Sequence, residues 1–77
     1  MEEFVQTRVG VEAFVEPQTL HHPLSVVLVA TDGEWVRFSI PDQNVLRDLG
    51  RRRALPVYDV GLVGYPKRMK EYRRPAE

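Results

Sequence analysis

The chain has 77 residues, 43% of them apolar and none of them cysteine, which suits one small folded domain and excludes disulfide bonds and thiolate zinc sites. Its formal net charge of zero hides a division: residues 1–46 carry seven acidic and two basic side chains, whereas residues 47–77 carry nine basic and four acidic ones. The acidic N-terminus lacks a secretory pattern and no apolar run approaches the roughly 20 residues that cross a bilayer, so we expect a cytoplasmic protein without a membrane segment.

The N-terminal segment predicts a first strand over residues 4–15. From position 7 onward, apolar and polar side chains alternate, as in a half-buried strand. Ala13 and Val15 share the inner face in that register. Gly10, in the middle of the segment, favours a bulge, which would return Phe4 to the same inner face.

A loop over 17–23 leads into a predicted hairpin. Residues 24–31 are almost all Val, Leu and Ala, as expected for a central strand that is covered on both faces. Asp32 and Gly33 follow at once and predict a type I′ turn, which needs a positive φ at both central residues. The return strand over 34–40 then places its even-numbered apolar residues on one face and its odd-numbered residues on the other.

A helix and a fourth strand follow. Asp42 or Ser39 can serve as the N-cap, apolar residues recur at helical spacing as far as Leu49, and Gly50 suits the position just past the helix end. The cations of Arg51–Arg53 are then favoured at the negative end of the helix dipole. Residues 57–63, between a proline and a glycine, predict the fourth strand.

The order of these elements, β-β-β-α-β, predicts a small α+β domain in which one helix packs on a face of an antiparallel sheet. We expect the domain to occupy residues 1–66. Residues 67–77 form a basic C-terminal segment, expected as a short helix or a partly ordered tail.

The charge division favours a non-enzymatic interaction module, and the leading hypothesis is that its basic half binds DNA or RNA. Basic side chains that neutralise phosphates would give salt-sensitive binding, and aromatic side chains could stack on unpaired bases. The hypothesis requires the two basic clusters to form one patch. The candidate phosphate contacts are Arg51, Arg52, Arg53, Lys67, Arg68, Lys70, Arg73 and Arg74, and the candidate stacking residues are Trp35, Tyr65 and Tyr72.

The alternative hypothesis is protein–protein interaction, either with an acidic protein surface or as a self-assembling homo-oligomer. Tyr65, Met69 and Tyr72 recur at helical spacing and would form the contact, since aromatic residues and Met are enriched at interfaces. The same stripe could instead pack the C-terminal segment back onto the sheet.

Catalysis, cofactor binding and metal binding have little support. The chain has no phosphate-binding glycine loop and no nucleophile motif. His21 and His22 are adjacent, so in an extended loop they point to opposite sides and do not form a chelating pair. We therefore expect no enzyme activity, no cofactor and no metal site.

Overall fold

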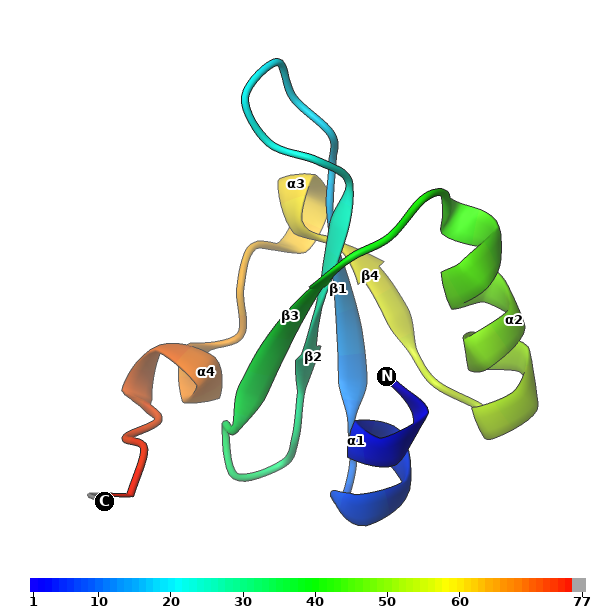
Figure 1. The fold of residues 1–77 in the computed structure, drawn as a ribbon. Helices are drawn as coiled ribbons and strands as arrows, with labels where there is room; N and C mark the ends of the chain where they lie inside the picture. Colours follow the sequence, from blue (N-terminus) through cyan, green and yellow to red (C-terminus); the bar gives the residue numbers. More distant parts are fainter. Residues whose placement is uncertain (76–77) are drawn as a thin grey trace.

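The computed structural model describes residues 1–75 and has a four-stranded sheet with helices on both of its faces (Figure 1). None of the helices in this range is long and apolar enough to span a membrane. In chain order, the elements are α1 (Glu2–Thr7), β1 (Glu12–Glu16), β2 (Ser25–Val29), β3 (Trp35–Ser39), α2 (Gln43–Arg53), β4 (Val57–Asp59), α3 (Val60–Val63) and α4 (Lys67–Glu71).

The predicted α+β class is confirmed, and the sheet is mixed. The strand order is β3-β2-β1-β4, in which β1 and β3 both pair with β2 antiparallel. By contrast, β4 pairs with β1 parallel. This differs from the expected antiparallel sheet because α2 carries the chain back to the end where β3 began, so that β4 runs in the same direction as β3 and β1.

Each face of the sheet carries its own apolar cluster. On the first face, alternate residues of the strands pack beneath α1 and α2, whose main contributions are Phe4, Leu46 and Leu49. On the second face, a smaller cluster around Phe14 is covered by side chains from β3, α3, α4 and the segment between the two helices. The predicted division of β3 between the two faces is confirmed. The members of the second cluster are Phe14, Val27 and Val29, with Trp35, Val60, Tyr65 and Met69 packed against them.

The first predicted strand is wrong over its N-terminal half. Residues 2–7 form α1, whose acidic first turn suits the positive end of a helix dipole. Phe4 reaches the core from this helix and not through a bulge. A turn with Gly10 at φ 63° separates α1 from β1, and Thr31 fixes this turn because its backbone N–H and its hydroxyl both donate to Val9 O, at 2.9 and 2.8 Å.

The hairpin between β2 and β3 is confirmed, but its turn type is not. Of the two central residues predicted, only Gly33 has a positive φ, at 95°. Gly33 N–H donates to Ala30 O at 3.0 Å, and Ala30 N–H donates to Glu34 O at 2.8 Å. The loop therefore has three residues and ends in a left-handed glycine, which is the second common hairpin geometry.

The helix α2 begins as predicted and ends later than predicted. Asp42 caps it by accepting a hydrogen bond from Asn44 N–H at 2.7 Å. Gly50 lies inside the helix, which ends at Ala54 in the left-handed conformation, so the arginine run forms the last helical turn. The fourth strand is shorter than predicted, because Asp59 ends it by capping α3.

Candidate interaction surfaces

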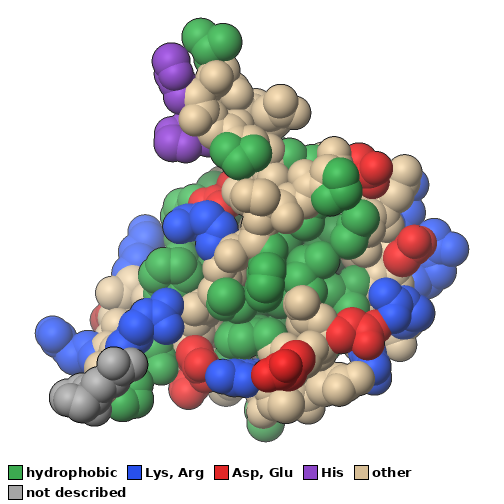
Figure 2. Space-filling view, in the orientation of Figure 1, with side chains coloured by type: hydrophobic (Ala, Val, Ile, Leu, Met, Phe, Trp, Pro, Cys, Tyr) green, Lys and Arg blue, Asp and Glu red, His purple; other side chains and the backbone are tan. Residues whose placement is uncertain are grey.

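The two basic clusters lie on opposite faces of the sheet. Arg51–Arg53 belong to α2, which packs on the first face. Lys67, Arg68 and Lys70 belong to α4, whose Met69 packs on the second face, and Arg73 and Arg74 follow that helix. Figure 2 shows the corresponding groups of Lys and Arg at opposite sides of the molecule. The sheet therefore separates the two clusters that a single phosphate-binding patch would have to join.

Several of the predicted phosphate contacts form ion pairs with the acidic half of the chain. Arg52 and Arg53 both pair with Glu2, and Arg68 pairs with Glu12 at 2.5 Å. Ion pairs between the two halves of the chain therefore neutralise part of the charge that the sequence divides between them. Each such pair is partly exposed and contributes modestly to stability.

Other cations of the basic half are exposed to solvent. Among residues 1–75, no ion pair involves Arg51, Lys67, Lys70 or Arg73, and all four are exposed. Three of them, Lys67, Lys70 and Arg73, lie in or directly after α4. These side chains keep their charge available for an anionic partner.

The three candidate stacking residues are all engaged within the fold. The guanidinium carbon of Arg74 lies 4.9 Å from the centroid of the Trp35 ring, and the guanidinium carbon of Arg37 lies 5.5 Å from it. Tyr72 also has Arg74 against its ring, at 5.8 Å. Tyr65 donates its hydroxyl hydrogen bond to Glu16. Stacking on nucleic-acid bases by these rings stays a prediction.

The aromatic stripe of the C-terminal segment faces largely inward. Tyr65 and Met69 pack against the second apolar cluster, and Tyr72 is half-buried beside the hairpin turn. Arg68 ties the same segment to the hairpin by donating to Ala30 O at 3.0 Å. This arrangement agrees with the interpretation of the stripe as internal packing.

Glu16 is the centre of a polar network on the second face. Arg37 donates to both of its carboxylate oxygens, at 2.7 and 3.0 Å, and the hydroxyls of Ser25 and Tyr65 donate to the same group. Burial alone would raise the pKa of Glu16, but these hydrogen bonds and the charge of Arg37 outweigh it and lower the pKa to about 2. The network joins three strands to the segment that precedes α4. Sequence reasoning missed it because its members are distant in the chain.

The two histidines lie in the loop between β1 and β2, where both are exposed (Figure 2). His22 also lines a hollow of about 640 Å³ beside the Glu16 network. Within residues 1–75, no three His, Asp or Glu side chains gather in an arrangement that could hold a metal ion.

The first face of the sheet is only partly covered, and we call its uncovered part the open face. Figure 2 shows hydrophobic side chains gathered there, in front of the sheet and between α1 and α2. The strand alternation predicts which residues of β3 point to this face, but it does not predict that α2 leaves them half-exposed. The half-buried residues of the open face are Met1, Val5, Leu24, Val36 and Phe38.

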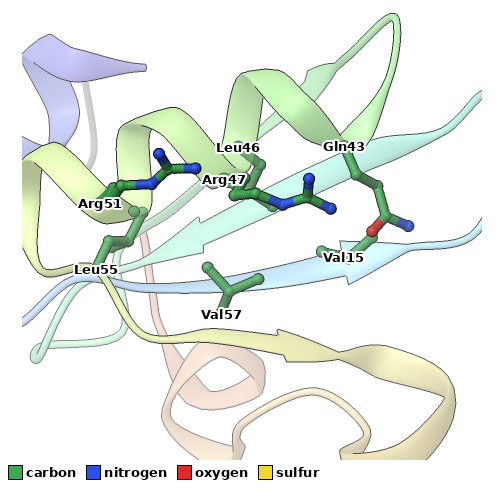
Figure 3. Close-up of a pocket in the computed structure, with 8 residues that line it drawn as sticks. Val15, Gln43, Leu46, Arg47, Arg51, Leu55 and Val57 are labelled. Atoms are coloured by element: carbon green, nitrogen blue, oxygen red, sulfur yellow. The ribbon is translucent and has the colours of Figure 1, made fainter.

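A groove of about 360 Å³ lies between α2 and β4 (Figure 3). Sequence reasoning did not identify it, although it predicted the helix and the fourth strand that border it. Its lining residues are Val15, Gln43, Leu46, Arg47, Gly50, Arg51, Leu55 and Val57.

No protein-family model matches the chain, and the searches of curated proteins and of solved structures find no match to it.

Proposed function

We propose that this protein is a non-enzymatic protein-interaction module that assembles with a second copy of itself through the open face. The observation that carries this proposal is the gathering of partly buried apolar side chains between α1 and α2 (Figure 2). Contiguous exposed apolar surface with a polar rim is typical of interaction sites. Covering it would contribute about 25 cal/mol for each Å² of apolar surface removed from water.

The surroundings of the open face favour a second copy as the partner. Val36 and Phe38 belong to β3, which is an edge strand, so a partner can approach them from the side. Two of the carboxylates near α1 are paired, Glu34 with Arg8 and Glu2 with two arginines of α2, whereas Glu3 is exposed and forms no ion pair among residues 1–75. Two copies related by a twofold axis would bring apolar patch against apolar patch, with these ion pairs already formed within each copy.

The expected result is a molecular mass that rises with concentration from 8.9 kDa toward the dimer value. Phe38→Glu is expected to hold the protein at the monomer mass, because it places a charge in the centre of the contact. Sedimentation equilibrium between micromolar and millimolar protein measures this directly. Circular dichroism of each variant checks that the fold is retained, and Val36→Thr provides a milder change in case the first variant unfolds.

The matched control is Leu20→Glu, because Leu20 is 92% exposed in the loop between β1 and β2. It adds the same charge to an apolar position outside the open face, so its mass should follow that of the unchanged protein. A monomer mass at every concentration would overturn the proposal. So would a dimer that survives a correctly folded Phe38→Glu variant.

Nucleic-acid binding is a second candidate function, and the exposed, unpaired cations in and after α4 favour it. If it is correct, short DNA or RNA strands should bind with an affinity that falls steeply as salt rises. Replacing Lys67, Lys70 and Arg73 with Ala should then weaken binding to every sequence alike and flatten the salt dependence. Fluorescence anisotropy at low and near-physiological salt measures both quantities. The triple Ala variant of Arg51–Arg53 tests the cluster on the other face, and unchanged affinity in both triple variants would refute this candidate.

A further inference from the structure

We infer that the groove between α2 and β4 binds an extended, acidic segment of a partner protein, which adds to the sheet as a strand beside β4. The inference does not depend on self-assembly through the open face. It rests on an unpaired strand edge, an apolar groove beside that edge, and two arginines on the groove rim.

The outer edge of β4 has backbone groups without partners in the described part of the chain. β4 is the last strand of the sheet and pairs only with β1. Ala13 N–H donates to Pro56 O at 2.9 Å, and because successive residues of a strand alternate their backbone direction, the N–H and C=O of Val57 point away from β1. An edge of this kind can accept an added strand through main-chain hydrogen bonds.

The groove provides a place for the side chains of such a strand. Its floor is aliphatic, formed by Val15, Leu46, Leu55 and Val57. Gly50 keeps it open, because a Cβ at this position would already lie 3.4 Å from Leu55 O and 3.6 Å from a methyl of Val57. Every second side chain of the added strand would face the groove, and an apolar side chain among them would lie on this floor.

The rim of the groove selects for negative charge. Arg47 and Arg51 are four residues apart on α2, so they share one helix face, and Figure 3 shows both on the α2 side of the groove, across from Val57. Neither forms an ion pair among residues 1–75, although Arg47 donates to the side chain of Asn44 at 3.2 Å. Asp59, at the end of β4, turns its carboxylate onto Gly61 N–H at 2.6 Å.

The composition of the groove favours a polypeptide over a nucleic acid. A phosphate backbone could pair with the two arginines, but it would leave the aliphatic floor without a complementary group. The lining residues also include no aromatic ring on which a base could stack. The floor and the rim lie on the same face of the sheet, so a peptide that presents aliphatic and acidic side chains two residues apart, on one face, matches both.

The test uses three synthetic peptides with blocked ends, Ser-Glu-Ser-Val-Ser-Glu-Ser, in which Val and both Glu share one face of the strand, and its versions with both Glu changed to Gln or to Lys. We titrate each into isotope-labelled protein and follow backbone amide signals by NMR. The acidic peptide is expected to perturb the groove residues, to bind about three- to tenfold more tightly than the Gln peptide, and to lose that preference at high salt. N-methylation of the peptide amides should weaken binding at every second position, because only alternate N–H groups face β4.

Three protein variants separate the parts of the inference. The double variant Arg47→Gln with Arg51→Gln should bind the acidic and Gln peptides equally. Gly50→Leu should abolish binding of both by filling the groove, whereas Gly50→Ala is the matched control and should retain it. Circular dichroism confirms the fold of each variant.

Several outcomes would overturn the inference. These are the absence of peptide binding at millimolar concentration, binding that Gly50→Leu does not affect, and N-methylation effects without a two-residue period. Equal binding of all three peptides would refute the acidic preference. Perturbation of the groove by a DNA or RNA oligonucleotide, with none by peptides, would assign the groove to nucleic acid instead.

Discussion

Gly33→Ala is expected to lower the free energy of unfolding by more than about 2 kcal/mol and to loosen the C-terminal segment, because two costs coincide there. The first cost is the backbone conformation, since Gly33 has a φ of 95°. The second is steric: a Cβ at this position would overlap the carbonyl group of Arg68, with its carbon at 2.9 Å, and would lie 3.2 Å from Cβ of Tyr72. Chemical denaturation measures the loss of stability.

Gly64→Ala is the matched control for this prediction. Gly64 also has a positive φ, at 72°, but a Cβ there would meet no atom within 4 Å. Its cost should therefore come from the backbone alone, about 1–3 kcal/mol, because its ψ of −174° lies in a region that almost only glycine adopts. The fluorescence of Trp35, the single tryptophan, should change in Gly33→Ala alone, because Arg74 packs on its ring. Unchanged Trp35 fluorescence in Gly33→Ala would refute the close packing of α4 on the hairpin.

The sequence was sufficient to predict the parts of the fold that depend on local pattern. The alternation along β1 and β3 identified the side chains that face the first apolar cluster, although β1 was expected to be half-buried and Phe14 is buried on its other face. Of the two candidate N-caps, Asp42 is the one that starts α2. These predictions succeed because side-chain direction in a strand and hydrogen bonding at a helix start are set by a few neighbouring residues.

The predictions that failed concern features set by distant contacts. Gly10 lies in the turn after α1, where Thr31 from the hairpin binds the carbonyl of Val9, and nothing near Gly10 in the sequence indicates this contact. Gly50 resembles a helix end, yet it lies within α2, which continues to Arg53. In both cases the glycine alone did not identify the local structure, since Gly10 lies in a turn instead of a strand bulge and Gly50 lies inside the helix instead of after its end.

The candidate sites show the same limit. The sequence identified the basic residues but could not show that α2 and α4 pack on opposite faces of the sheet. The groove and the Glu16 network are also assembled from separate elements, so neither has a continuous motif. Arg47 illustrates the difference, since its place on the groove, which it shares with Arg51, separates it from the other arginines.

Glu16→Gln is expected to lower the free energy of unfolding at neutral pH by about 2–3 kcal/mol. The pKa of Glu16 lies at about 2 in the folded protein against 4.5 for a free glutamate, and a pKa unit corresponds to about 1.4 kcal/mol. The expected loss is smaller than the full pKa shift would give, because Arg37 is half-exposed and solvent screens its charge. Glutamine would also direct an N–H group toward donors that now share the carboxylate.

The pH dependence follows from the direction of this shift. Since the folded pKa is lowered, the contribution of Glu16 is complete above pH 4.5 and is lost as the pH falls through that value toward 2. Denaturation curves at several pH values should show this fall in the unchanged protein and a flatter profile in Glu16→Gln. The pKa of Tyr65, which its hydrogen bond to Glu16 raises, should move back toward its ordinary value in the variant.

Glu34→Gln is the matched control, because Glu34 also accepts two hydrogen bonds from one arginine, Arg8, at 3.1 and 2.8 Å. It lacks the hydroxyl donors that Ser25 and Tyr65 supply to Glu16, and its side chain is more exposed, 25% against 16% for Glu16. Its loss of stability should therefore be clearly smaller. If both variants lose the same amount, the two hydroxyls add nothing to the arginine pair. The anchoring of the C-terminal segment through Tyr65 would then depend on apolar packing alone.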